Sequence, residues 1–176
     1  DWQTTVDGKL KSLEASGGIA GRRKEIAAKT EYRVRNPQPV AGLGATQGPR
    51  AWLFDPSIVV ADDIRDAKGN LIAARGTKVN PLGLVQLKTD LVFVDGRDPA
   101  QIAWATSKWE STKAKIIFVA GSPFDRMGEY KRRFFFDQQG KLTQHFGIAH
   151  VPAVVSQEGE ALRIQELLAP KPKGGA

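Results

Sequence analysis

The chain has 176 residues, with 26 lysines and arginines against 19 aspartates and glutamates, so its formal net charge is +7 at neutral pH. Its 41% hydrophobic content is enough for one core plus a smaller appendage. The sequence contains no cysteine, which excludes disulfides, thiolate nucleophiles and sulfur-ligated metal sites. It also lacks the uninterrupted run of roughly 20 apolar residues that a membrane-spanning helix needs.

The two histidines and the basic residues give no clear binding motif. His145 and His150 are five residues apart, a spacing that does not place both on one helical face, so we expect no metal and no cofactor. Basic residues cluster only at 21–24 and 131–133. Short runs of this kind usually form a solvated surface, although a basic nucleic-acid-binding protein remains an alternative.

Residues 1–35 predict an N-terminal helical arm in two pieces, because a helical apolar pattern is interrupted by Gly17, Gly18 and Gly21. The apolar stripe is too thin to form a core alone. The arm is therefore either a frayed terminal helix or a surface that docks on the rest of the chain or on a partner. Its candidate interface residues are Leu10, Leu13, Ile19 and Ile26.

A linker and a small β region follow the arm. The segment 36–50 is rich in proline and glycine and carries little charge, which is typical of a linker or an extended crossing segment. Within 51–88, two strand-like runs at 57–66 and 71–79 flank Gly69-Asn70 and predict a β-hairpin. Such a piece is marginally stable alone, so we expect it to pack on a neighbour.

The remaining chain alternates strands and helices, which predicts an α/β domain with a mixed sheet over 89–168 and a flexible tail over 169–176. Asp98 and Pro99 suit the start of a helix. The expected strands lie at 91–96, 113–121, 134–137, 152–157 and 161–167, and the expected helices at 96–110, 123–131 and 142–147.

The run FFFDQQGKLTQHFGIAHVPAVV over 134–155 is typical of a thioredoxin-like chain that enters a strand after its cis-proline loop. The bond before Pro152 is a candidate cis peptide. The preceding strand should lead to the redox loop, here Gly121 to Asp125, where Ser122 suits a helix cap better than a nucleophile. Without sulfur the site is redox-dead, but its strand edge could still bind a polypeptide. The candidate partner-binding residues are Gly121, Ser122, Pro123, His150, Val151 and Pro152.

Three further features bear on function. Asp95, Arg97 and Asp98 follow a strand, where an α/β enzyme places its site, so a thiol-independent enzyme is an alternative. Capping by Asp98 and surface pairing by Arg97 are favoured.

Trp104 and Trp109 are five residues apart and are not expected to be stacked neighbours on one face. The closing strand is expected to leave Leu162, Ile164 and Leu167 uncovered, so the arm or a partner must shield them.

Four stretches of sequence occur in a characteristic order: RAWLFDPSIVVADDIRD (50–66), GTKVNPL (76–82), FVDGRDPAQIAWA (93–105) and the run FFFDQQG to FGIAHVPA. Within them, LFDP, VNPL and the DGRDPAQ block are not required by any general rule of folding, so a match to them is specific. They resemble the TraW family, the periplasmic assembly proteins of F-type conjugative type IV secretion systems. The resemblance implies a periplasmic protein whose signal has been removed and which is required to build the conjugative pilus. It implies two partners, a TrbC-like thioredoxin-fold protein and a TraU-like protein, and no catalytic residue, cofactor or small-molecule substrate.

Overall fold

The computed structural model describes residues 2–15 and 17–171. The chain divides into two compact units, Asp1–Pro37 and Gln38–Ala176, and each is described by itself. The end of the predicted tail, 172–176, lies outside the described residues. Among the residues that are described, no helix is both long and apolar enough to cross a membrane.

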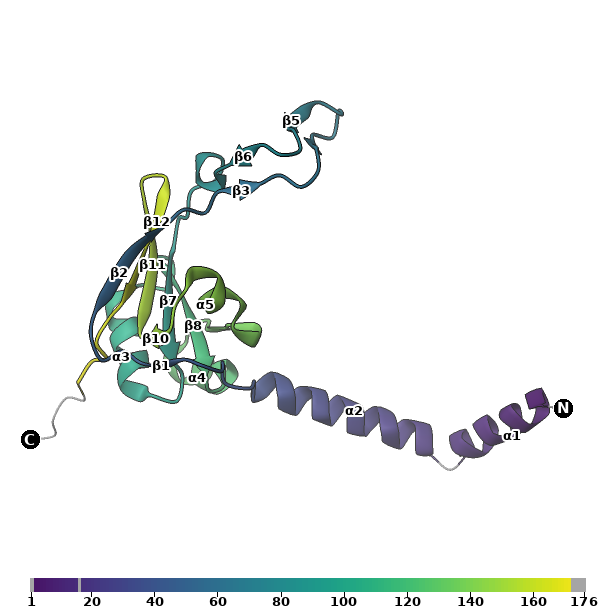
Figure 1. The fold of residues 1–176 in the computed structure, drawn as a ribbon. Helices are drawn as coiled ribbons and strands as arrows, with labels where there is room; N and C mark the ends of the chain where they lie inside the picture. The colour runs from purple at the N-terminus through teal and green to yellow at the C-terminus, as the bar shows by residue number, and fades with distance from the viewer. Residues whose placement is uncertain (1, 16, 172–176) are drawn as a thin grey trace, which may run out of the picture. The chain divides into compact units, whose positions relative to one another are not determined.

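The first unit consists of the two helices that the glycines predicted, α1 (Trp2–Ala15) and α2 (Gly18–Arg35) (Figure 1). Gly17 separates them with a left-handed backbone, φ 69°. None of the described side chains of α2 is buried. Its acids pair with bases one turn later, Glu25 with Lys29 and Glu31 with Arg35, and exposed pairs of this kind add only a few tenths of a kcal/mol each.

The candidate arm interface is only partly described. The side chains of Leu10 and Leu13 lie outside the part of the chain that the structure describes. Ile19 is half-buried and Ile26 is 64% exposed. Because the rest of α2 is also exposed, this helix gains little from burial of its own apolar side chains.

The second unit is built on a six-stranded mixed sheet in the order β2-β12-β11-β7-β8-β9 (Figure 1). The pairs β7 with β8 and β8 with β9 are parallel, and the other neighbours are antiparallel. This is the mixed α/β arrangement that the sequence predicts. Its strands are β2 (Arg50–Phe54), β7 (Asp90–Asp95), β8 (Ala114–Ala120), β9 (Phe135–Phe136), β11 (Ala153–Glu158) and β12 (Ala161–Glu166), and its helices are α3 (Pro99–Lys108), α4 (Pro123–Tyr130) and α5 (Lys141–Phe146), with short 3₁₀ turns at Pro81–Gly83 and Gln138–Gly140.

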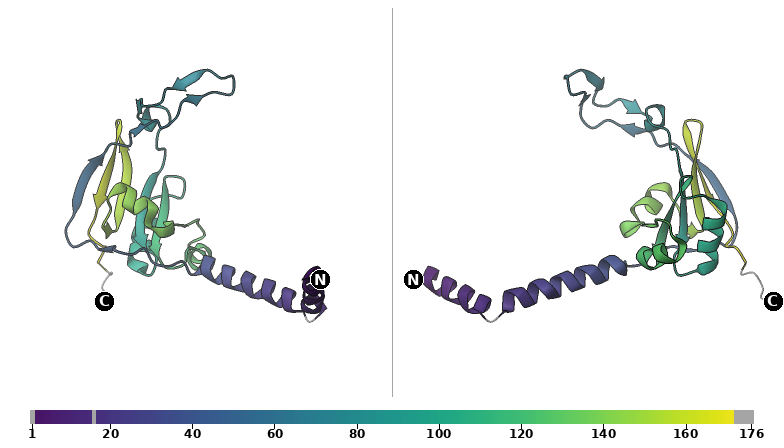
Figure 2. Two further views of the ribbon diagram at one scale, coloured as in Figure 1. Left: turned by 45° about the vertical axis from the view of Figure 1, so that its right-hand side comes forward. Right: turned by 180° about the vertical axis from the view of Figure 1, so that it is seen from behind.

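Each face of the sheet has its own apolar core, because alternate residues of a strand point to opposite faces. On one face Phe93 of β7 packs with Phe146 of α5. On the other face Val92 and Val94 pack with Ile102 of α3. The helices α3 and α5 accordingly cover opposite faces (Figure 2).

The small β region is joined to the main sheet through its first strand. Its first strand, β2, pairs with β12 and forms one edge of the sheet. The predicted hairpin is present but consists of two short antiparallel pairs, β3 (Ile58–Val59) with β6 (Lys78–Val79), and β4 (Ile64–Arg65) with β5 (Leu71–Ala73). The sequence pattern marked the strands but could not show that β2 finds its partner more than 100 residues later.

The closing strand is not left uncovered, so this prediction was wrong. Leu162 is 7% exposed and Ile164 is fully buried. Both belong to the core on the α5 face, where Trp52 and Phe54 of β2 pack against them. Leu167 is half-buried against the other core. β2, which begins at the end of the predicted linker, therefore supplies the apolar side chains that shield this part of the closing strand.

The two tryptophans are neighbours in the structure, although they are not stacked. Trp104 and Trp109 contact each other edge to face, with ring centroids 5.3 Å apart. Trp109 follows the last residue of α3 with an extended backbone, φ −122° and ψ 127°, so helical spacing does not govern where its ring lies. The indole N–H of Trp109 donates to Asp90 at 3.0 Å, which fixes the ring at the edge of the core.

Two glycines bring the ends of β7 and β8 into close contact. Gly121 has φ 81°, and a side chain there would place its Cβ 2.7 Å from the carbonyl carbon of Gly96. At Gly96 a Cβ would lie 2.3 Å from the ring of Phe118. Only glycine fits at both positions, because backbone and a buried ring cannot move aside.

Replacing Gly121 with alanine is expected to lower the free energy of unfolding by about 2 kcal/mol or more, since the change adds both a left-handed strain and a backbone clash. Urea denaturation followed by tryptophan fluorescence measures this. The matched control is Gly128→Ala in α4, where a Cβ meets nothing within 4 Å and helix propensity favours alanine. Equal effects of the two substitutions would contradict the close packing.

Candidate functional site

A buried aspartate fixes the helix that leads into the proline loop. Asp137 is 1% exposed, and its carboxylate accepts hydrogen bonds from the backbone N–H groups of Leu142 (2.9 Å) and Thr143 (3.0 Å) and from the hydroxyl of Thr143 (2.8 Å). These bonds satisfy the first turn of α5. The helix ends at Gly147, which has φ 71°, so both ends of this short helix are specified by the sequence.

The loop after α5 is paired with the segment that we call the strap, residues 38–46. The bond between Val151 and Pro152 is cis. Just before it, β10 (His150–Val151) pairs in parallel with β1 (Gly44–Ala45) of the strap. The N–H of Gly44 donates to Ala149 O, and the N–H of Thr46 donates to Val151 O, both at 3.0 Å.

The strap is tied to the sheet at a second point. The N–H of Val40 donates to the carbonyl of Val119 in β8 at 2.8 Å, and its side chain packs on the core beside α5. A Cβ on Gly140 would approach the Val40 side chain to 2.6 Å. The backbone edge that the sequence suggested for an extended partner is therefore occupied by the protein's own chain.

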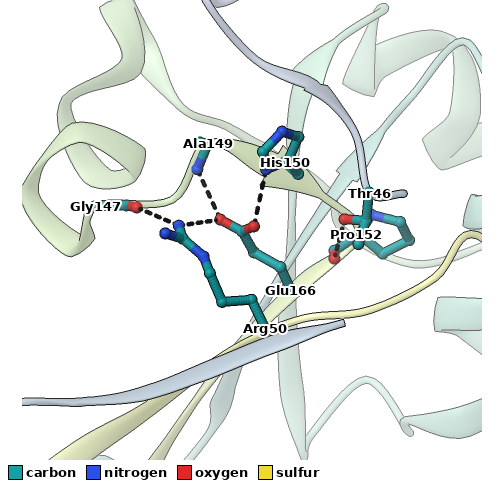
Figure 3. Close-up of polar contacts among 7 residues, drawn as sticks. All are labelled: Thr46, Arg50, Gly147, Ala149, His150, Pro152 and Glu166. Atoms are coloured by element: carbon teal, nitrogen blue, oxygen red, sulfur yellow. Dashed lines mark hydrogen bonds and ion pairs between the residues drawn. The ribbon is translucent and has the colours of Figure 1, made fainter. Parts of the chain in front are cut away.

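A buried carboxylate, Glu166, joins the strands to the loop (Figure 3). Glu166 lies at the end of β12 with its side chain 1% exposed. It accepts hydrogen bonds from Arg50 Nη2 (2.8 Å) and from the N–H of Ala149 (2.9 Å), and it contacts His150 Nδ1 at 2.9 Å. Arg50 also donates to the carbonyl of Gly147 at 3.3 Å. These residues, which we call the Glu166 clamp, connect β2, β12 and the loop.

The contacts of the clamp stabilise the ionised form of Glu166. Burial raises the pKa of this carboxyl, but the hydrogen bonds from Arg50, Ala149 and His150 and the charge of Arg50 outweigh it and hold the pKa below its usual value. A buried carboxylate is tolerated only where partners of this kind satisfy it. The clamp is a structural device, and its outer rim, Arg50 and His150, is about half exposed.

The sequence prediction missed Glu166 and Arg50. Leu162, Ile164 and Glu166 alternate along β12 and share one face, and the first two are core residues. An acid at the third inward position of an alternating strand is a sign of a buried polar group with a partner. That partner, Arg50, stands at the end of a segment that reads as a linker.

The structure does not place Gly121, Ser122 and Pro123 beside the cis-proline. They follow β8, whereas β7 lies between β8 and β11 in the sheet. The loop that neighbours the proline strand is therefore the one after β7, at 95–98. Ser122 stands at the start of α4, but its side chain makes no capping bond, and its hydroxyl is buried without a hydrogen-bond partner among the described residues.

The carboxylates of that neighbouring loop already have partners. Asp95 binds the guanidinium of Arg97 through two nitrogens at 3.0 and 2.8 Å. Burial raises the pKa of Asp95, but hydrogen bonds from Arg97 outweigh it and lower the pKa overall. Asp98 accepts from the N–H of Ala100 at 2.9 Å and caps α3, as predicted. An ionised, paired carboxylate is a poor proton donor, so this loop does not resemble an acid-base centre.

The space between this loop and the strap is small. A cavity of about 140 Å³ is bordered by Val40, Asp95, Arg97 and Val151, among others. Typical ligand pockets in proteins measure 300–1,000 Å³. The space beside the proline loop is therefore too small for most ligands. No group of histidines and acids among residues 2–15 and 17–171 is arranged to hold a metal ion.

The fold and the site define a cysteine-free, mixed α/β protein whose loop edge is occupied by its own strap. No family model matches the chain, and no solved structure matches it. The chain is 41% identical over 160 residues to Protein TraW of Escherichia coli strain K12, and the match covers 89% of this chain and 75% of that protein. Identity at this level over this length shows common descent. The chain belongs to the TraW family.

Replacing Glu166 with glutamine is expected to lower the free energy of unfolding by about 1–3 kcal/mol, because a buried acceptor to several donors loses its charge while its shape is kept. The matched control is Glu158→Gln, since the Glu158–Arg163 pair is about half exposed and should contribute much less to stability. Urea denaturation at neutral pH compares the two, and a loss at position 158 that equals the loss at 166 would contradict the clamp.

The Glu166 clamp also predicts a pH dependence. The folded pKa of Glu166 lies below its unfolded value of about 4.5, so its contribution is complete above that value and is lost as the pH falls through the folded pKa. Between pH 7 and pH 3, the stability difference between wild type and Glu166→Gln is expected to shrink. A difference that stays constant or grows as the solution becomes acidic would show that the carboxyl is not held ionised.

Proposed function

We propose that this chain is a non-enzymatic assembly factor for the conjugative pilus and the F-type type IV secretion apparatus, acting through contacts with other assembly proteins. The observation that carries the proposal is the 41% identity to Protein TraW over nearly the whole chain. The structure supports it indirectly, because Asp95, Asp98 and Glu166 all serve local hydrogen bonds and ion pairs.

We also propose that the domain at 89–168 is thioredoxin-like and has no redox function. Supporting features are the β7-α3-β8 unit, the antiparallel β11 and β12, and the cis bond at Pro152 where β11 begins. A redox protein of this kind needs reactive thiols at a helix start, and the chain contains no cysteine. The body would then serve as a rigid support for contact surfaces.

The partners that fit this role are a TrbC-like thioredoxin-fold protein and a TraU-like protein, and the compartment is the periplasm. Among the candidate contact residues, Pro123, Val151 and Pro152 are buried, whereas His150 is exposed. A partner would therefore touch the loop through side chains such as His150 rather than by strand pairing, since the strap holds the edge. The exposed Ile26 of the arm offers a second contact.

Isothermal titration of the purified chain against purified TrbC-like and TraU-like proteins of the same conjugative system tests the proposal. We expect a complex with at least one of them, unaffected by reductant. Ile26→Glu is expected to weaken it about tenfold or more if the arm is an interface. The control is Tyr32→Glu, which is 68% exposed and lies on a different side of the same helix. Lack of association of the wild-type chain with either protein would contradict a scaffold role.

A further inference from the structure

The hairpin at 55–80, which contains β3, β4, β5 and β6, exposes an unusual share of apolar side chains. Val60 and Ala73 are its only buried apolar residues among those described. In Figure 1 the hairpin, where β3, β5 and β6 are labelled, extends away from the main sheet. Five large apolar side chains are between 44% and 68% exposed, namely Ile58, Val59, Ile64, Leu71 and Ile72. Adjacent residues of a strand point to opposite faces, so these side chains are divided between the two faces of the hairpin. Exposed apolar side chains concentrated in one segment often mark an interaction site.

Several polar groups of the hairpin are satisfied within it, whereas many of its apolar side chains are exposed to solvent. Asp66 accepts hydrogen bonds from the N–H groups of Lys68 and Asn70 and from the Asn70 amide. Asp55 pairs with Lys78 across the two strands at 3.1 Å. A two-stranded hairpin is marginally stable at best in water unless further strands or packing support it. We therefore expect a partner to cover one of its faces.

The charges of the hairpin are divided between its two arms. The first arm, 55–66, carries four acids and one base, while the second arm, 67–80, carries three bases and no acid. The hairpin as a whole is thus neutral on a chain of net charge +7, so two copies of it do not repel each other. The acids are Asp55, Asp62, Asp63 and Asp66, and the bases are Arg65, Lys68, Arg75 and Lys78.

We propose that the partner is a second copy of this chain, with the two hairpins stacked face to face about a twofold axis that runs along the strands. That symmetry places the acidic arm of each copy over the basic arm of the other and encloses apolar side chains between them. Asp62 and Arg75 suit such pairing, because neither side chain forms an ion pair with the described part of the chain.

Other arrangements of two copies fit less well. Joining equal edges would place acid against acid or base against base, which is destabilising for directly opposed charges. Joining the acidic edge of one copy to the basic edge of the next leaves free edges at both ends and gives open polymers. Only the stacked arrangement closes at two copies with opposite charges in contact. The interface is small, so a reversible dimer is expected.

Sedimentation equilibrium of the full chain measures this directly. We expect a monomer-dimer equilibrium with a Kd below about 100 µM, as for small transient interfaces. Leu71→Ser should raise the Kd about tenfold. The control is Leu53→Ser, which is equally apolar, is 60% exposed and lies on β2 outside the hairpin. Thermal unfolding of each variant confirms that the second unit stays folded.

Charge reversal gives the sharper test. Asp62→Lys reduces the net charge of the first arm from −3 to −1, and Arg75→Glu reduces that of the second arm from +3 to +1. In a dimer of either variant alone, like charges then face each other at these positions, so each should dimerise about fivefold more weakly than wild type. An equal mixture of the two variants should form a heterodimer and recover the wild-type affinity. A single cysteine introduced at Leu71, on the enclosed face, should crosslink copies through a disulfide, since the chain has no other cysteine.

A wild-type chain that remains monomeric at several hundred micromolar would overturn the proposal, as would a dimer that Leu71→Ser leaves unchanged. Failure of the mixed charge variants to associate more tightly than either alone would overturn the stacked arrangement. These outcomes are independent of binding to TrbC-like or TraU-like proteins, so the assembly role and the dimer can fail separately.

Discussion

The ionised, buried carboxylate of Glu166 is the interaction on which the loop geometry depends. It joins Arg50 at the start of β2, Glu166 at the end of β12, and Ala149 and His150 of the proline loop. Arg50 and Glu166 are more than 100 residues apart in the sequence. Removing the charge would leave several donors without their acceptor in a site that water reaches poorly, which is more costly than losing an exposed ion pair.

The strap gives the loop around Pro152 a structural role. In this chain the edge beside the proline binds residues 44–46 of the same polypeptide, and the cavity beside it is too small for most ligands. The loop therefore completes the fold and does not present an open groove. Exposed surfaces outside this edge include the α2 helix, the hairpin and the rim of the Glu166 clamp.

Local features of the fold could be predicted from sequence, and pairings between distant segments could not. Asp98 and Pro99 identified the start of α3, and the pattern around Pro152 identified the site of the cis bond. The pairing of β2 with β12 and of β1 with β10 was missed, because residues 38–50 show no alternation of apolar and polar residues. The order of strands in the sheet is also a nonlocal property. Without it, Gly121 to Pro123 could be assigned next to the proline, where 95–98 lies instead.

Amide hydrogen exchange measured by NMR on the full chain tests most directly whether the strap closes the loop. The N–H groups of Gly44 and Thr46, which donate to Ala149 and Val151, should be protected to nearly the same degree as core amides of β7 and β11, because opening them requires loss of the packed strap. Exchange of these two amides as fast as that of an exposed loop would contradict the account, since the edge beside Pro152 would then be free for another chain.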